Sequence, residues 1–267
     1  MGADHFRPRT GLDPFEAVLA QRDVAGQPFI IVGGQAANIW AAYYLPREPR
    51  LQAHFPFTSK DLDLIGTKTD AERVAAAIHW HAGAPSVGGG PVEAVLRSEP
   101  EGAGLNVEFL RDIKGVPHDT ILAYARENLV RVAGGDKPLL VRVLDPVLLL
   151  AGKIRNAVDI EQNQPNRPRQ DVKHVAMLVL CVPHFLEDMR AQAVERAERR
   201  EVCGKYITML ASLKTTYSGR QFEAGHPGII HWAGLIPETV RRLPFDWQIQ
   251  NCLRQLGGES QSRGGRI

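Results

Sequence analysis

The sequence predicts an α/β fold in which a mixed β-sheet domain is followed by a mainly helical domain. Short apolar runs bounded by glycine or polar turns fill the first half, whereas helical periodicity dominates after residue 144. The chain has 267 residues, more than a typical single domain, and 44% of them are hydrophobic, which is enough for a sizeable core. We therefore expect a sheet domain at 1–143, a helical domain at 144–256 and a flexible tail at 257–267.

In the first half, each element follows from an apolar run and the turn that ends it. Residues 29–32 are a short apolar run that stops at Gly33-Gly34, and residues 35–44 are rich in helix formers, so we expect a strand, a glycine turn and a helix. The same reasoning predicts, in order, a strand at 59–65, a helix at 74–80, strands at 92–96 and 105–110, a short helix at 120–128 and a strand at 139–143.

The second half opens with a clear helix start. Asp145 is suited to cap a helix whose first residue is Pro146, and an apolar stripe follows with Lys153 at its edge. From there the ammonium of Lys153 could leave the packed face and reach a phosphate. A second helix is predicted to begin at Asp171, an ion-paired helical stretch at 185–216 follows, and a last helix at 236–256 is interrupted near Pro244.

Two carboxylates in the predicted strand at 59–65 indicate a cation site. Asp61 and Asp63 alternate with leucines, so a β-strand would point both acids to one face. Gly33 and Gly34 would let the backbone pass close to a ligand, and the N–H groups at the start of the following helix would attract phosphate. A phosphate-binding turn beside paired acids favours a nucleoside triphosphate (NTP) with Mg²⁺.

This order of a glycine pair, a helix and an Asp-x-Asp strand resembles the nucleotidyltransferase superfamily, whose members add nucleotides to alcohols, antibiotics, proteins or RNA ends. The resemblance implies a third acid from a later strand, and Glu108 takes that place, where the family more often has Asp. Gly34 and Asp61 are 27 positions apart, more than the usual spacing of the family. An insertion at 45–57, which contains three prolines, would explain the excess.

A second motif narrows the resemblance. The helix Pro-x-x-Leu-Leu-x-x-Lys at 146–153, the arginine-bearing loop at 162–170 and the helix start Asp-x-Lys-His at 171–174 resemble the AbiEii type of nucleotidyltransferase toxin. Such proteins occur in toxin–antitoxin and phage-defence systems, and the resemblance implies that Lys153 and Asp171 belong to the active site. We also expect four neighbouring cationic side chains to line the edge of the site and to bind polyphosphate or an RNA backbone: Arg155, Arg167, Arg169 and Lys173. His174 shares a helix face with Asp171, so it could touch a substrate, but a position on the helix surface is expected.

The resemblance implies a Mg²⁺-dependent transfer of a nucleoside monophosphate from an NTP to an acceptor hydroxyl, with release of pyrophosphate. Asp61 and Asp63 would hold two Mg²⁺ ions, Glu108 would share one of them, and Gly33 and Gly34 would position the phosphates. The acceptor would be tRNA or another RNA end, or a protein hydroxyl, and a separate antitoxin protein would relieve the resulting growth arrest. Two alternatives stay open: a non-catalytic nucleotide- or RNA-binding member of the fold, and a nucleotidyltransferase that modifies an antibiotic.

The overall composition is consistent with an enzyme but does not indicate its substrate. The net charge of +2 is too near balance to indicate a nucleic-acid partner by itself. Cys181, Cys203 and Cys252 are odd in number and lack zinc or Cys-x-x-Cys spacing, which argues against a disulfide framework. No signal-like or membrane-spanning apolar stretch is apparent, so we expect a cytoplasmic protein without a membrane partner.

Overall fold

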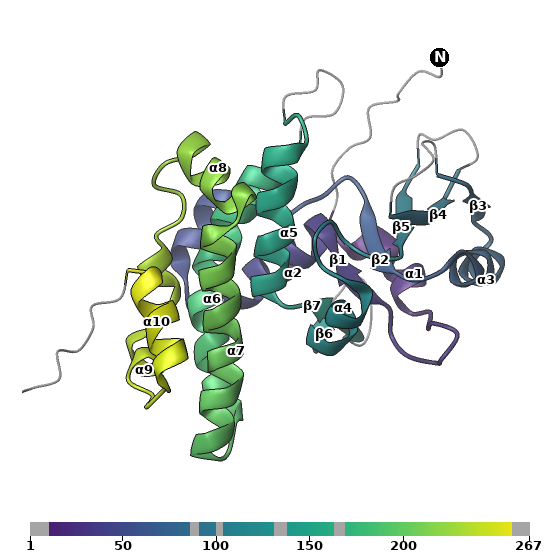
Figure 1. Ribbon diagram of the computed structural model, residues 1–267. Coiled ribbons are helices and arrows are strands. Elements are labelled where there is room, and N and C mark those ends of the chain that lie inside the picture. The colour runs from purple at the N-terminus through teal and green to yellow at the C-terminus, as the bar shows by residue number, and fades with distance from the viewer. Residues whose placement is uncertain (1–10, 86–90, 100–103, 131–137, 163–168, 258–267) are drawn as a thin grey trace, which may run out of the picture.

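A computed structural model describes residues 11–85, 91–99, 104–130, 138–162 and 169–257 of the chain. Its fold is of the α/β class, with a mixed seven-stranded sheet and a helical second half, which confirms the predicted class (Figure 1). Across these residues, no helix combines the length and the apolar character that a bilayer span needs.

The sheet has the strand order β3-β4-β5-β2-β1-β7-β6. Two neighbouring pairs are parallel, β1 with β7 and β2 with β5, and the other neighbours are antiparallel. The centre of the sheet is therefore built from strands that lie far apart in the chain. The strands are β1 (Ile30–Val32), β2 (Leu62–Ile65), β3 (His81–Gly83), β4 (Val92–Arg97), β5 (Asn106–Leu110), β6 (Ala125–Val130) and β7 (Leu139–Leu144).

Most helices of the first half lie around the sheet, but η2 packs on α6. The helices of the second half stack beside one another, with α5, α6 and α7 as the longest members (Figure 1). In the first half they are η1 (Asp13–Phe15), α1 (Glu16–Leu19), α2 (Gly33–Tyr44), η2 (Pro49–His54), α3 (Lys68–Ile78) and α4 (His118–Tyr124). In the second half they are α5 (Pro146–Asp159), α6 (Asp171–Gln192), α7 (Arg196–Thr215), α8 (Tyr217–Gly225), η3 (Trp232–Leu235), α9 (Glu238–Arg241) and α10 (Trp247–Gln255).

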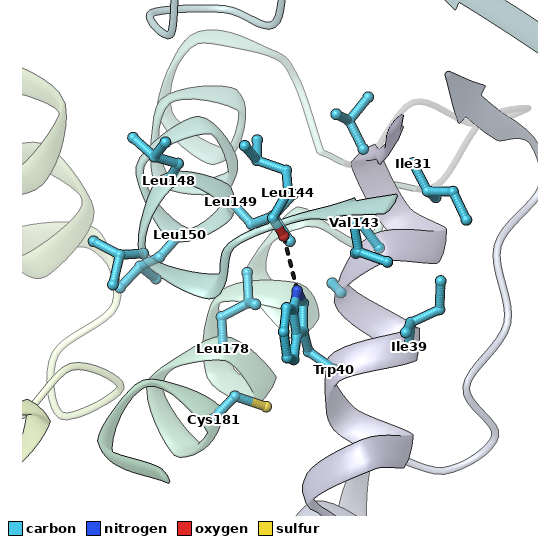
Figure 2. Close-up of a cluster of buried hydrophobic side chains, with 14 of the residues drawn as sticks. Ile31, Ile39, Trp40, Val143, Leu144, Leu148, Leu149, Leu150, Leu178 and Cys181 are labelled. Atoms are coloured by element: carbon cyan, nitrogen blue, oxygen red, sulfur yellow. Dashed lines mark hydrogen bonds between the residues drawn. The ribbon is translucent and has the colours of Figure 1, made fainter. Parts of the chain in front are cut away.

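A continuous cluster of buried apolar side chains joins the sheet to the helices of the second half. Helix α2 packs on β1 and also on α5 and α6, so it couples the two halves. Figure 2 shows Trp40 of α2 among side chains from β7, α5 and α6, with its indole N–H donating to the buried Leu144 carbonyl oxygen at 2.8 Å. Because a buried carbonyl without a donor is unfavourable, this bond fixes the end of β7 against α2.

The start of α5 follows its prediction. Asp145 is fully buried and its Oδ1 accepts the Leu148 N–H at 2.8 Å, while Pro146 occupies the first helical position. The Tyr206 hydroxyl of α7 donates to Oδ2 at 3.3 Å. Burial is the main cause that raises the pKa of Asp145 to about 7.

The predicted helix at 120–128 is wrong in its second part. Helix α4 ends at Tyr124, and residues 125–130 form β6, which pairs with the whole of β7. Local preference was outweighed here by a long-range strand ladder. The predicted helix at 74–80 begins earlier, at Lys68, because Thr67 and Asp70 form a capping box. Residues 258–267 of the predicted tail lie outside the described residues.

Candidate active site

Asp63 faces the first turn of α2. Val32, the last residue of β1, is the register partner of Asp63 in β2, so the chain turns into α2 directly beside the carboxylate. The Gly34 N–H donates to that carboxylate. Gly33 has a positive φ of 66°, and a Cβ built on it would overlap Oδ2 of Asp63. Only glycine therefore fits at position 33, for both backbone and steric reasons.

Four charged groups from both halves of the chain influence one another at this point. Burial and the nearby charge of Asp61 raise the pKa of Asp63 to about 6, while Lys153, the Gly34 N–H and Arg169 act in the opposite direction. Asp61 immediately precedes β2 and is half-buried. The two acids predicted from the sequence therefore lie close enough to repel each other, and two cations of the helical half lie within range of them.

Glu108 occupies the neighbouring strand at the same level. Strands β2 and β5 are parallel, and Asp63 is the register partner of Glu108. Partners in a parallel pair point to the same face of the sheet, so the half-buried Glu108 side chain lies on the face of Asp63. Within the described ranges, no three His, Cys, Asp or Glu side chains already form a metal-holding cluster.

Lys153 and Asp171 form a buried ion pair between α5 and α6. Lys153 Nζ lies 2.9 Å from Asp171 Oδ1, and their side chains are 9% and 2% exposed. Arg169 Nε contacts the other oxygen, Oδ2, at 2.6 Å. Burial raises the pKa of Asp171, but Lys153 and Arg169 outweigh that effect and lower it to about 2.

This geometry corrects the prediction for Lys153. The sequence placed its ammonium at the edge of an amphipathic helix, extended toward a phosphate, whereas the side chain is buried and held by Asp171. The pairing joins the two residues that the family resemblance singled out. It also holds a positive charge near Asp63, because Lys153 lowers the pKa of that acid.

The expected surface position of His174 is also wrong. His174 is 3% exposed, and its Cε1 would lie 3.1 Å from a Cβ built on Gly34. Ser59 approaches the same point, with Oγ at 2.5 Å. The sequence does indicate that His174 lies near Asp171, because residues three positions apart share a helix face. Whether that face is buried depends on tertiary packing, which the spacing does not show.

The predicted cationic rim is only partly brought together. Arg169 joins the ion pair of Asp171, and Lys173 Nζ donates to the Pro56 carbonyl oxygen at 2.9 Å. The guanidinium of Arg155 instead lies over Gly115, in the turn after β5. Arg167 lies outside the described residues.

A surface cavity of about 690 Å³ lies elsewhere, between α7, α10 and Tyr124. None of the candidate active-site residues named above lines it. Its charged lining is mixed, and its Lys205 is already paired with Glu201 at 2.8 Å. The cavity is therefore separate from the acids and the buried ion pair of the candidate active site.

No protein-family model matches this chain, and no curated protein sequence matches it significantly. Carboxylate oxygens are the ligands that Mg²⁺ prefers, and the charge of Asp61 raises the pKa of Asp63, a repulsion that a divalent cation would relieve. The donor set therefore fits Mg²⁺.

Proposed function

We propose that this protein is a Mg²⁺-dependent nucleotidyltransferase, resembling the AbiEii type, that moves a nucleoside monophosphate from an NTP to an acceptor hydroxyl and releases pyrophosphate. The single observation that carries the proposal is the convergence of charges at Asp63. Three features from distant parts of the chain come together there: the glycine turn before α2 near residue 30, the two carboxylates near residue 60 and the buried ammonium near residue 150.

Asp61, Asp63 and Glu108 would hold the metal. When bound, Mg²⁺ would lower the pKa of the acceptor hydroxyl and offset the charge of the triphosphate. Asp63 also accepts the Gly34 N–H, so it stabilises the start of α2 in addition to serving the site. Replacing Asp63 by Ala would therefore disturb the fold as well as the chemistry, and Asp63→Asn, which keeps an acceptor for this N–H, is the better test.

From its buried place beside Asp171, the Lys153 ammonium would stabilise the negative charge that develops on the leaving pyrophosphate. This ammonium is desolvated and fixed by Asp171, and an oriented charge in a buried site needs little reorganisation during the reaction. Asp171 is thus a positioning residue, and Arg169 holds its second oxygen. Gly33 and Gly34 would let the β- and γ-phosphates approach the backbone at the start of α2.

For the acceptor, we favour tRNA or another RNA end, with a protein hydroxyl as the alternative within the same chemistry. Lys173 and Arg169 place positive charge beside the site, which suits a phosphate backbone better than a cationic aminoglycoside. A toxin role that a separate antitoxin protein relieves belongs to the same proposal. A non-catalytic nucleotide- or RNA-binding protein remains the competing proposal, since Glu108 replaces the more common Asp.

The test is a transfer reaction with each of the four α-labelled NTPs, Mg²⁺ and either total RNA, total protein or an aminoglycoside. We expect label in RNA with the wild type, loss of labelling by Asp63→Asn, and loss on omission of Mg²⁺. A wild-type protein that binds NTP but labels none of the three acceptors would favour the non-catalytic alternative. Label in the aminoglycoside alone would assign the antibiotic-modifying function instead.

A further inference from the structure

The predicted insertion at 45–57 is a folded unit attached to α6. Glu48 accepts the Arg50 N–H at the start of η2 and also contacts the Arg50 side chain at 2.7 Å and His184 Nε2 of α6 at 3.4 Å. Leu51 is fully buried. Because the Glu48–His184 hydrogen bond and the buried Leu51 fix η2 on α6, the segment that follows η2 returns to the sheet along a defined path.

That returning segment, residues 54–59, is held against the candidate active site. The Pro56 carbonyl oxygen accepts the Lys173 ammonium at 2.9 Å, and Lys173 lies between Asp171 and His174 on α6. At its end, Ser59 reaches the same point near Gly34 as His174 does. Residues 54–59 therefore run along the site from the lysine-bearing turn of α6 to the glycine turn of α2.

This segment presents one aromatic ring to solvent. Phe55 is 62% exposed, and its ring packs edge-on against Phe57 at a centroid distance of 5.6 Å. Phe57 itself is half-buried against the core and supports the exposed ring. An isolated exposed apolar residue needs no functional explanation. The place of Phe55 matters more than its exposure, because the next residue, Pro56, accepts a hydrogen bond from Lys173, one position before the buried His174 on α6.

We propose that Phe55 is a stacking platform for a nucleobase whose phosphates lie at Lys153 and the acid pair. This inference rests on the proposed function and names how the site recognises a nucleotide beyond its phosphates. An aromatic face next to cations is the usual arrangement for binding an unpaired base, with about 1–3 kcal/mol of stabilisation per stacked base. The base belongs either to the NTP or to the end of the acceptor RNA, and the stacking chemistry is the same.

The first arm of the test compares an NTP with inorganic tripolyphosphate, each titrated calorimetrically into the protein with Mg²⁺. If Phe55 stacks on the base of the NTP, Phe55→Ala should weaken NTP binding by about tenfold or more and leave tripolyphosphate binding unchanged. Phe55→Tyr should retain the affinity. Trp247→Ala is the matched control, because Trp247 is also an exposed aromatic residue, 70% exposed, and it belongs to α10 and not to residues 54–59.

The second arm uses a short single-stranded RNA and the same RNA with an abasic 3′-terminal ribose. If the base comes from the acceptor, Phe55→Ala should weaken binding of the complete RNA only, with NTP binding unchanged. Equal affinities of wild type and Phe55→Ala for both NTP and RNA would overturn the platform while leaving the phosphate site in place. A wild type that binds neither NTP nor tripolyphosphate would instead refute the proposed function, and the platform with it.

Discussion

The buried pair of Lys153 and Asp171 gives a prediction whose size can be worked out from the structure. Asp171→Asn removes the negative charge that holds the Lys153 ammonium and leaves that ammonium in a site where its side chain is only 9% exposed. Arg169, which is one-third exposed, can turn to solvent, whereas Lys153 cannot. Loss of one partner from a buried pair is strongly destabilising because the other charge stays desolvated.

The magnitude follows from the pKa of Asp171. In the folded protein that pKa is lowered from 3.8 to about 2. A depressed pKa adds stability above the unfolded value, and this stability is lost as the pH falls from about 4 through about 2. The difference of nearly two pKa units corresponds to about 2 kcal/mol in the free energy of unfolding, present at pH 7 and largely gone at pH 2.

Urea unfolding of wild type and Asp171→Asn at a series of pH values from 7 to 2 measures this directly. We expect the variant to be less stable by about 2 kcal/mol at pH 7, and the difference to shrink below pH 4. Lys153→Met should have a smaller effect than Asp171→Asn, because Arg169 still pairs with Asp171 at 2.6 Å. A stability difference that stays constant with pH, or a larger loss for Lys153→Met, would show that the charge of Asp171 does not stabilise the fold through Lys153.

Two further predictions concern the glycine turn and the start of α5. Gly33→Ala should lower the free energy of unfolding by at least about 1–2 kcal/mol, because alanine at φ 66° is strained and its Cβ overlaps Asp63; an unchanged urea midpoint would contradict this. Asp145 has a pKa raised from 3.8 to about 7, so its contribution to stability is present below pH 4 and is lost as the pH rises through 7. Asp145→Asn keeps an acceptor for the Leu148 N–H. As the pH rises from 5 to 8, this variant should become more stable relative to wild type, by at most about 4 kcal/mol in the free energy of unfolding. A difference in melting temperature that does not change with pH would contradict this.

Elements defined by local signals were predictable from the sequence. The run at 29–32 before two glycines became β1 and the start of α2, and the Asp145-Pro146 pair became the capped start of α5. Backbone preferences and capping decide these features over a few residues. Residues 125–128 were misassigned as helix because their conformation depends on pairing with β7, a contact that local preference does not encode.

The residue types of the site were predictable, but their environments were not. Alternation in the β2 segment identified Asp61 and Asp63, and the spacing of the α5 and α6 motifs identified Lys153 and Asp171. Burial of Lys153 and of His174 arises only when α5, α6 and α2 pack together. A single helix pattern reports which residues share a face, not which faces are covered.

If the acids and the buried ammonium direct nucleotidyl transfer, the α- and γ-phosphates of the NTP must end in different products. The preferred NTP, labelled at either the α- or the γ-phosphate, is incubated with Mg²⁺, RNA and either wild type or Asp63→Asn. We predict that wild type transfers the α-label to RNA and releases the γ-label as pyrophosphate, and that Asp63→Asn does neither while unfolding at a similar urea concentration. Transfer of the γ-label, release of γ-labelled orthophosphate alone, or full activity of Asp63→Asn would contradict the account.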